Sequence, residues 1–459
     1  MEDEVFDTRF SLDNLRAVYE EEIAGRGGAG MDGVSPSRFE EQKAEQFQII
    51  RRKCRDGTYT FTPYREVLKS RGRNKKPRVI SIPTVRDRIV LLILKDILHD
   101  IFDDCVNRSL PNQVIRRLKE FYLSDKSNDK KIYRADIESF YGDIEYEYLE
   151  HKLRSRIDSE RIINLLLRAI KTPTVPKNYR YTDKDKYKKG KGIPQGLSIS
   201  NILAEICLEG LDHNMRQKFA FYERYVDDII IFWKADSLSS VVTMLGNELN
   251  NRGGLSLNSD KSHPIKTDSG FQYLGYYFKG ENVTVRKKSV DEFIDSLAAK
   301  FTYIRENFEE EKRKRDNVED SDLKRIFVES LNNRLTGVIS EDRRYGWIFY
   351  YVEINDEELL HRIDAIVRDF FGRSPCFQEV PSSLQRIARA YWEAQSNPRG
   401  GYIRNYDALN NPKKKYHYLL ERGLVDPSEQ YSTDEIEKLF RREKDQVIST
   451  LESDAGTLS

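Results

Sequence analysis

The chain has 459 residues, of which 77 are Lys or Arg and 76 are Asp or Glu, so its formal net charge is +1. No apolar run exceeds the six residues of 89–94 and 347–352, which excludes a membrane-spanning helix of about 20 residues. The acidic start MEDEVFDTRF has no signal-peptide pattern, so we expect a cytoplasmic protein without a membrane partner. The 4 cysteines and 6 histidines show no metal-ligand spacing, so carboxylates must hold any metal.

Charge is segregated along the chain despite the near-zero total. Residues 1–50 hold 5 basic against 12 acidic side chains, whereas residues 51–100 hold 14 against 5. Residues 171–191 add 8 basic against 2 acidic side chains. The two basic segments predict a polyanion-binding surface, and solvated loops are the alternative.

The first 286 residues mix strand and helix patterns. A Gly-rich loop precedes a helix expected to begin near Ser35 or Ser37. Alternating and 3.6-residue apolar periods then predict further elements. These are a β-hairpin over 58–83, a helix over 85–100, a strand over 131–137, one or two helices over 145–171, one helix over 197–215, two strands over 219–233 joined at Asp227 and Asp228, and a strand over 271–278.

The remainder of the chain is predicted to be mainly helical. Four amphipathic helices are expected, over 290–308, 320–335, 357–371 and 382–395. The residues from Asp426 onward form an acidic tail, which we expect to be partly disordered. The predicted class is α+β, with four regions: 1–45, 46–286, 287–425 and 426–459.

Acidic side chains stand at the ends of two apolar strand patterns. Asp136 lies in YRADIESFYGDI (133–144), and Asp227 and Asp228 lie in YERYVDDIIIFW (222–233). Carboxylates among core residues are costly unless a cation binds them. Two Mg²⁺ ions would satisfy this need, because a two-metal site clamps the attacking and leaving oxygens of a phosphoryl displacement. An ordinary hairpin turn is the alternative for the Asp227-Asp228 pair taken alone.

These segments, in this order, resemble the reverse transcriptases, including their group II intron, retron and phage-defence branches. YVDD is similar to polymerase motif C, Asp136 to the start of motif A, and GIPQGLSISN (192–201) to motif B. GLSLNSDKS (254–262) resembles motif D, and FQYLGY (271–276) resembles motif E. Upstream, GMDGVS (30–35) resembles an N-terminal extension, and KKPRVISIPTVRDRIV (75–90) resembles the fingers motifs. The resemblance implies a right-hand polymerase with fingers and palm, followed by a helical thumb.

The resemblance also implies a role for each matching residue. Asp136 and Asp227 would bind both Mg²⁺ ions, with Mn²⁺ as the alternative metal, and Asp228 would be an outer ligand. Lys261 would be a general acid for pyrophosphate, with a surface lysine as the alternative. Nucleotide-binding residues would be Lys69, Lys76, Arg78, Tyr141, Gln195 and Gly196.

Tyr141 would lie beneath the sugar and exclude ribonucleotides, or else be a core tyrosine. Expected contacts to nucleic acid are made by Lys184, Lys186, Lys188, Lys189 and Tyr225.

The implied function is RNA-directed DNA synthesis from deoxynucleoside triphosphates, with an RNA template and a DNA product. A stand-alone enzyme of antiphage defence is the first choice, with a non-coding RNA or a protein encoded nearby as a further partner. The alternatives are a group II intron maturase, a template-independent or RNA-synthesising polymerase, and a catalytically idle nucleic-acid-binding scaffold. The form YVDD and Tyr141 favour DNA synthesis.

Overall fold

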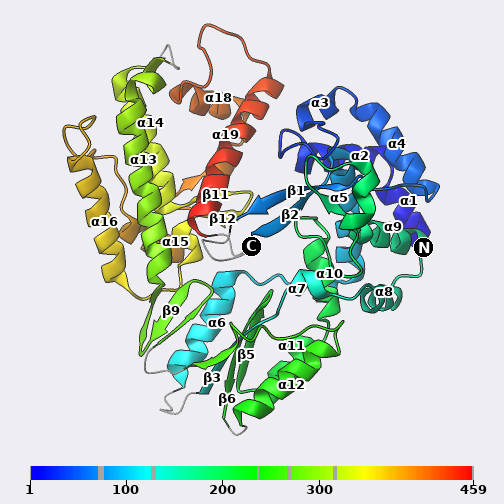
Figure 1. The fold of residues 1–459 in the computed structure, drawn as a ribbon. Coiled ribbons are helices and arrows are strands. Elements are labelled where there is room, and N and C mark those ends of the chain that lie inside the picture. Colours follow the sequence, from blue (N-terminus) through cyan, green and yellow to red (C-terminus); the bar gives the residue numbers. More distant parts are fainter. Residues whose placement is uncertain are drawn as a thin grey trace. The chain divides into compact units, whose positions relative to one another are not determined.

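The computed structural model describes residues 2–70, 77–125, 131–234, 237–265, 270–313 and 318–456. The chain divides into two compact units, each described by itself below. Unit 1 comprises residues 1–109 and 130–265, and unit 2 comprises residues 110–129 and 266–459 (Figure 1). Helices combine with mainly antiparallel sheets in both units, so the fold class is α+β. Among the described helices, none is long and apolar enough to cross a bilayer.

The first half of unit 1 consists of helices and one β-hairpin. Helices α1 (Glu2–Arg9), α2 (Leu12–Val18), α3 (Pro36–Glu40) and α4 (Lys43–Arg55) precede strands β1 (Tyr64–Lys69) and β2 (Arg78–Ile82), which pair antiparallel. Ser35 caps α3 by accepting a hydrogen bond from the amide of Arg38, as expected for an N-cap serine. Helix α5 (Val85–Ile101) buries Ile89, Ile93 and Ile97, each contributing roughly 1.5–3 kcal/mol.

The second half of unit 1 is built on a four-stranded sheet of order β5-β6-β3-β7. Its strands are β3 (Lys131–Asp136), β5 (Phe221–Tyr225), β6 (Asp228–Trp233) and β7 (His263–Ile265), and all three pairings are antiparallel. The short strand β4 (Thr174–Val175) instead pairs with β1. The surrounding helices are α7 (Phe140–Asp143), α8 (Tyr146–Arg154), α9 (Glu160–Lys171), α10 (Ser200–Cys207), α11 (Leu211–Lys218) and α12 (Leu238–Asn250). This arrangement brings the ends of β3 and β6 together.

The single helix predicted over 197–215 is wrong. The chain forms α10 and α11 with a break at Gly210, whose φ of 76° is left-handed. The predicted strand over 271–278 is likewise two strands, β8 (Phe271–Tyr273) and β9 (Tyr276–Lys279). They are joined through Leu274 and Gly275, which both have positive φ. In each case the apolar pattern continues through a turn that the backbone makes at a glycine.

Unit 2 packs a helix from the middle of the chain on its first sheet. This sheet has the order β10-β9-β8, with β10 at Asn282–Val285. In helix α6 (Pro111–Ser124), the Tyr122 ring lies edge-on to the stacked rings of Phe271 and Phe278. Arg116 of the same helix donates two hydrogen bonds to Glu353, at 2.9 and 2.7 Å. These contacts explain why residues 110–129 belong to the same unit as the distant segment 266–459.

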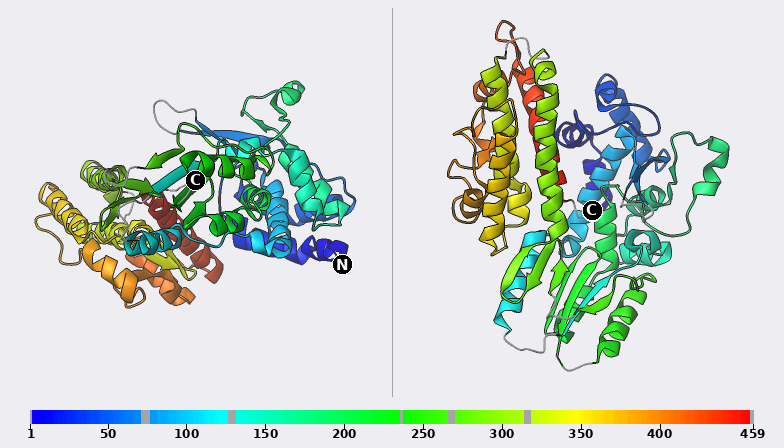
Figure 2. Two further views of the ribbon diagram at one scale, coloured as in Figure 1. Left: turned by 90° about the horizontal axis from the view of Figure 1, so that it is seen from below. Right: turned by 60° about the vertical axis from the view of Figure 1, so that its left-hand side comes forward.

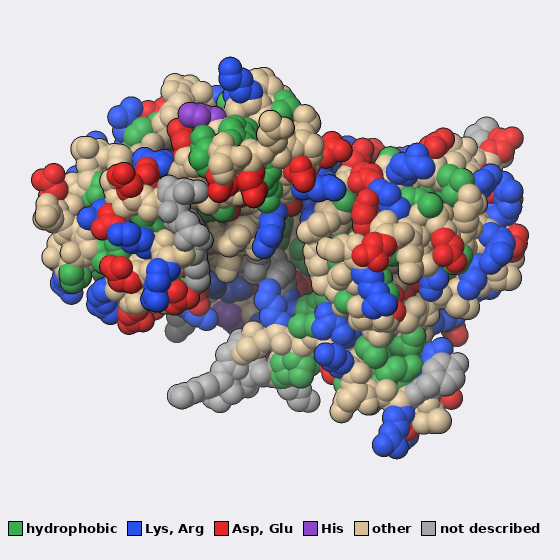
Figure 3. Space-filling view, turned by 90° about the horizontal axis from the view of Figure 1, so that it is seen from above, with side chains coloured by type: hydrophobic (Ala, Val, Ile, Leu, Met, Phe, Trp, Pro, Cys, Tyr) green, Lys and Arg blue, Asp and Glu red, His purple; other side chains and the backbone are tan. Residues whose placement is uncertain are grey.

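The remaining helices of unit 2 largely follow the predicted pattern. They are α13 (Lys287–Arg313), α14 (Asp320–Thr336), α15 (Trp347–Tyr350), α16 (Glu357–Gly372), α17 (Ile387–Ser396), α18 (Pro412–Glu421) and α19 (Thr433–Asp454). A small sheet of order β12-β11-β13 joins them, from Arg343–Tyr345, Val338–Ser340 and Arg404–Asn405. Helices α13 and α14 run side by side (Figures 1 and 2). Basic and acidic side chains are interspersed over the face drawn in Figure 3.

The segment expected to be a partly disordered tail contains the long helix α19. Its first turn carries a capping box, in which Ser432 and Glu435 bond reciprocally. Its apolar side chains Ile436, Phe440 and Leu451 are buried in a cluster with Tyr406 and other residues of unit 2. The acidic composition of this segment led to a prediction of disorder, although its apolar side chains are spaced for an amphipathic helix.

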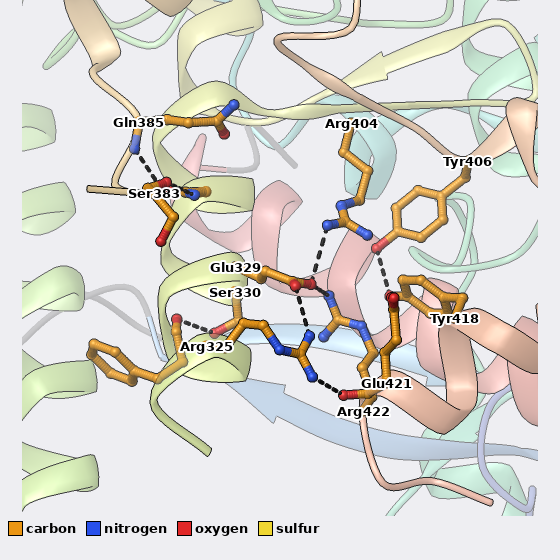
Figure 4. A network of polar contacts seen from close by, with 12 residues as sticks. Arg325, Glu329, Ser330, Ser383, Gln385, Arg404, Tyr406, Tyr418, Glu421 and Arg422 are labelled. Atoms are coloured by element: carbon orange, nitrogen blue, oxygen red, sulfur yellow. Dashed lines mark hydrogen bonds and ion pairs between the residues drawn. The ribbon is translucent and has the colours of Figure 1, made fainter. Parts of the chain in front are cut away.

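A partly buried polar network also holds unit 2 together. Glu329 of α14 accepts from Arg325 at 3.0 Å, and from Arg404 and Arg422 at 3.1 Å each (Figure 4). The carboxylate therefore joins α14 to β13 and to the end of α18. Removing it would leave the buried Arg422 with less compensation, which is costly for a buried charge.

Candidate active site

Three carboxylates meet where β3 ends and β6 begins. Asp136 is the last residue of β3, and the strand register places it opposite Asp228, the first residue of β6. Asp227 occupies the turn before β6, and its carbonyl accepts from the amide of Ile137 at 3.1 Å. Residues almost one hundred positions apart are thus brought to one point, as the sequence predicted.

The turn that carries Asp227 is unusual in its backbone. Tyr225 pairs with Asp228, so the hairpin loop is the dipeptide Val226-Asp227. Val226 has a φ of 55°, in the left-handed region that a β-branched residue rarely occupies. This conformation costs roughly 1–2 kcal/mol for an L-residue. The turn therefore stores strain beside the carboxylates, and neighbouring contacts must maintain it.

Two cationic side chains face the carboxylates. Lys261 places its Nζ 2.7 Å from both carboxylate oxygens of Asp136, and Arg134 donates to Asp228 at 2.8 Å. Burial raises the pKa of Asp227, and the charges of Asp228 and Asp136 raise it further. Close carboxylates that repel one another demand positive charge, which these two side chains supply in part.

The three carboxylates offer the oxygen ligands of a hard divalent cation, and in this structure Lys261 and Arg134 pair with two of them, Asp136 and Asp228. Asp136 is almost fully buried, yet it remains within reach of Lys261 and opposite Asp228. Clustered carboxylate oxygens are the ligands that Mg²⁺ and Mn²⁺ prefer. A separate group, Asp104, Cys105 and Glu209, also brings one possible ligand atom from each residue within 4.8 Å of the others. Arg156 already pairs with both of its carboxylates.

The segment carrying Lys261 is held against β3 by its backbone. The amide of Asn258 donates to the carbonyl of Asp136 at 2.8 Å, and the amide of Asp136 donates to the hydroxyl of Ser262 at 3.2 Å. These hydrogen bonds hold the backbone around Lys261 in place beside Asp136. In this geometry the ammonium is a counterion of Asp136, and it must turn away before it can protonate another group.

The loop before α10 packs against strand β2 of the hairpin. The amide of Ser81 in β2 donates to the carbonyl of Gln195 at 2.7 Å. Gly196 has a φ of 103°, and a Cβ there would stand 2.8 Å from the Ile80 side chain. Only glycine fits this approach without displacement. The loop and the hairpin are therefore packed as one surface.

Tyr141 lies between these parts. Its hydroxyl donates to the amide oxygen of Asn201 in α10 at 3.3 Å, and its carbonyl accepts from the amide of Ile193 at 2.6 Å. Burial raises the pKa of Tyr141 to about 12, with further contributions from Glu205 and Asp227. The tyrosine is therefore neutral at ordinary pH and lies close enough to Asp227 to feel its charge.

The other expected site residues are more dispersed. Arg78 is partly buried and lies opposite the exposed Lys69 in the hairpin register. It is close enough to Tyr141 to act on its pKa. Lys76 falls outside the described residues. The segment 176–191 extends away from the rest of unit 1 (Figure 2).

This segment carries the four expected lysines. Within it, Lys186 pairs with Asp183 at 2.7 Å and Lys188 pairs with Asp185 at 2.6 Å. Lys189 is exposed, and Lys184 is partly so. The lysines therefore lie on a projecting arm of unit 1.

Sequence reasoning missed the charged residues that support the carboxylates. Arg134 and Arg224 both stand inside strands, and Arg224 is buried with Glu205 and Asp212. One available signal was the pair of charges within the short, otherwise apolar and aromatic strand β5. Their partners are 12 to 94 residues away, so spacing could not identify them.

Comparison with known proteins agrees with this geometry. Residues 67–278 match the family model described as reverse transcriptase (RNA-dependent DNA polymerase). The protein YkfC of Escherichia coli K12 is 23% identical over 292 residues, covering 54% of this chain and 74% of YkfC.

Two further similarities cover different shares of the chains. The group II intron-encoded protein LtrA of Lactococcus lactis is 25% identical over 201 residues, covering 43% of this chain and 33% of LtrA. The chain therefore spans about a third of LtrA. A telomerase structure from Candida albicans has a TM-score of 0.39 at 13% identity, covering 79% of this chain and 71% of that one. The matched segment holds the carboxylates, Tyr141 and Lys261, so the part of the chain that forms this site is the part that is similar to the reverse transcriptase family.

Proposed function

We propose that this protein is a reverse transcriptase that extends a primer with deoxynucleotides along an RNA template. The observation that carries the proposal is the convergence of Asp136, Asp227 and Asp228 at the β3-β6 register, inside the matched domain. The partly buried cluster suits the binding of metal ions and of a triphosphate. The arm with Lys184 to Lys189 suits an RNA backbone.

Two divalent ions are part of the proposal, with Mg²⁺ first and Mn²⁺ as the alternative. Asp136 and Asp227 would hold both ions, and Asp228 would be an outer ligand. When bound, such ions supply Lewis-acid stabilisation for the displacement of pyrophosphate. The chain's own residues orient the substrate: Arg78 and Lys69 suit triphosphate oxygens, and Gln195 and Gly196 suit the nucleotide pocket.

The test is loss of synthesis without loss of folding. Asp136→Asn and Asp227→Asn each remove a charge at nearly constant volume. Either change should lower the rate of primer extension on an RNA template by roughly a thousandfold or more. Metal ions stabilise the transition state by several kcal/mol, and each 1.4 kcal/mol changes the rate about tenfold. The control is Asp158→Asn, an exposed aspartate at the turn before α9, which should retain full activity. Near-normal Mg²⁺-dependent synthesis by either cluster variant would refute the two-metal assignment.

We further propose a role in antiphage defence, which rests on the resemblance to the phage-defence branch. Phage should form fewer plaques on cells that express the wild-type chain than on cells that express the Asp227→Asn variant. Equal plaque counts across a phage panel would reject this role and leave the polymerase proposal standing. Sequencing the nucleic acid that copurifies with the protein would identify the template and any non-coding RNA.

A further inference from the structure

A buried arginine stands directly behind the catalytic turn. The Arg224 side chain in β5 is 3% exposed, and its guanidinium has three acceptors. It bonds to Glu205 at 2.7 and 3.2 Å and to Asp212 at 2.8 Å through two nitrogens. The third acceptor is the backbone carbonyl of Val226, at 2.9 Å.

The third contact acts on the peptide that carries Asp227. The carbonyl of Val226 and the amide of Asp227 belong to one planar peptide group. A hydrogen bond to that carbonyl therefore fixes the orientation of the whole peptide. Val226 has a φ of 55°, which its branched side chain disfavours, so the turn needs an outside contact to keep this shape.

The two carboxylates fix the guanidinium in turn. Glu205 belongs to α10, and Asp212 belongs to α11 on the other side of the Gly210 break. The Tyr222 hydroxyl donates to Asp212 at 2.9 Å, which adds a further constraint. Planar, bidentate contacts from both sides leave the guanidinium little freedom to rotate.

The same network reaches the nucleotide side of the site. Asn201 lies one helical turn before Glu205 on α10, and its amide oxygen accepts from Tyr141. Glu205 also acts electrostatically on Tyr141 and on Tyr225. One helix thus carries both the anchor of Arg224 and the partner of Tyr141.

We infer that Arg224 is a positioning residue that, anchored on Glu205 and Asp212, holds the Val226-Asp227 peptide and so sets the Asp227 carboxylate relative to Tyr141. This inference rests on the proposed polymerase function for its kinetic consequence. A buried ion network that served stability alone would not need a bond to the catalytic turn. Replacing buried ion pairs by apolar residues is often neutral for stability, which makes a stability role a weak explanation.

The test compares Arg224→Lys with a matched control, Arg252→Lys. A lysine keeps the charge but cannot bond to three separate acceptors with a planar fork. Arg252 also lies in unit 1, is 12% exposed, and bonds to a carboxylate of Glu248 and to the backbone carbonyl of Glu209. The hydrogen bonds of Arg252 go to Glu209 and Glu248, away from the β5-β6 turn, so this variant reports the general cost of such a change.

Two measurements distinguish positioning from stability. Arg224→Lys should lower kcat for single-nucleotide addition at least tenfold, while KM for the deoxynucleotide and Kd for the template-primer stay within twofold. Hydrogen exchange of peptides spanning 221–233 should quicken at least fivefold. Arg252→Lys should leave kcat and this exchange unchanged at a comparable loss of Tm. Glu205→Gln keeps the shape of the side chain and one acceptor oxygen, so it should lower kcat and quicken the exchange of the 221–233 peptides by smaller factors than Arg224→Lys. If Arg224→Lys does not fold, Glu205→Gln takes its place in the test.

The contrary result is equally definite. Equal losses of kcat in Arg224→Lys and Arg252→Lys, or unchanged exchange of the 221–233 peptides in Arg224→Lys and Glu205→Gln, would overturn the positioning role. A wild-type chain that adds no nucleotide to any primer would reject the proposed function instead. The exchange measurement needs no catalysis, so it still decides whether Arg224 holds the turn.

Discussion

Tyr141 combines a buried ring with a polar tip, and the two can be tested separately. The ring packs against the core of unit 1, while the hydroxyl donates to Asn201. A ring beneath the sugar would exclude a 2′-hydroxyl by steric overlap. The hydroxyl would instead act through α10, so single changes at this position distinguish a steric role from a hydrogen-bonding role.

We predict that Tyr141→Ala raises the ratio of kcat/KM for ribonucleotides to kcat/KM for deoxynucleotides, because the wall beneath the sugar is lost. Tyr141→Phe keeps the ring and should keep the wild-type ratio. Single-nucleotide addition with both sugars measures the effect. A Phe variant that loses discrimination as fully as the Ala variant would show that the hydrogen bond to Asn201 decides sugar choice. An unchanged ratio in both variants would leave Tyr141 as a core residue.

Single residues differ in how well the sequence predicted them. The sequence predicted carboxylates on neighbouring strands because Asp136 and the Asp227-Asp228 pair stand at the ends of apolar strand patterns, and the β3-β6 register places Asp136 opposite Asp228. Arg224 was not identified, because its acceptors lie on two helices and its role depends on a hydrogen bond to a backbone carbonyl. The ion pair between Lys261 and Asp136 was also not predicted, since the two residues are 125 positions apart.

At the scale of elements, periodicity predicted helices and strands well but misplaced their ends. Helix α5 and strand β3 match their predicted ranges to within one residue. The break at Gly210 was missed because apolar residues recur at helical spacing on both sides of it. Helix α19 was missed for a different reason: net charge was weighed above a visible capping box and an apolar stripe. The acidic composition and the apolar stripe occur in the same segment, and the burial of the apolar stripe against unit 2 makes it a helix.

Helix α13 carries a lysine in an unfavourable place. Burial lowers the pKa of Lys300 to about 8, and the charges of Arg334 and Arg422 lower it further, while Asp454 and Glu443 oppose them. Its Nζ lies 5.6 Å from the centre of the Phe327 ring. Because the folded pKa is below the usual 10.5, the unfolded chain binds more protons between pH 8 and 10.5. Stability therefore rises with pH across this window.

We predict that Lys300→Met stabilises the protein at pH 7 and that this gain shrinks by pH 10. The charged amine costs about 3 kcal/mol below pH 8 at roughly 1.4 kcal/mol for each pH unit of the shift, and methionine fills similar space without the charge. Thermal melts of wild type and variant at both pH values measure the difference. Lys287→Met, on the exposed start of the same helix, should give a difference that does not change with pH. A Lys300→Met gain of equal size at pH 7 and pH 10 would contradict the titration of Lys300.

At the scale of the whole molecule, charge segregated along the sequence is largely redistributed by folding. The acidic first 50 residues and the basic next 50 fold into the same unit, where Arg55 lies 3.9 Å from Asp7 and Arg161 pairs with Asp7 at 2.7 Å. Acidic side chains of the first segment therefore lie beside basic side chains from later in the chain. The arm over 176–191 differs, because it holds seven basic residues and two acidic ones, Asp183 and Asp185. Total charge is a poor guide to where a polyanion binds, and local excess is a better one.

The position of charge, rather than its total, should therefore govern RNA binding. We predict that replacing Lys184, Lys186, Lys188 and Lys189 by alanine weakens template binding and flattens its salt dependence, by about 0.7 to 0.9 in the log-log slope for each lost phosphate contact. The matched control replaces Lys413, Lys438, Arg441 and Arg442, which are exposed side chains of unit 2. Both sets remove four positive charges, so both variants have a formal net charge of −3 in place of +1. The Kd for a single-stranded RNA, measured from low to moderate salt, should change for the arm variant and stay near wild type for the control. Equal slopes in the two variants would mean that net charge alone attracts the RNA and that the arm is a solvated loop.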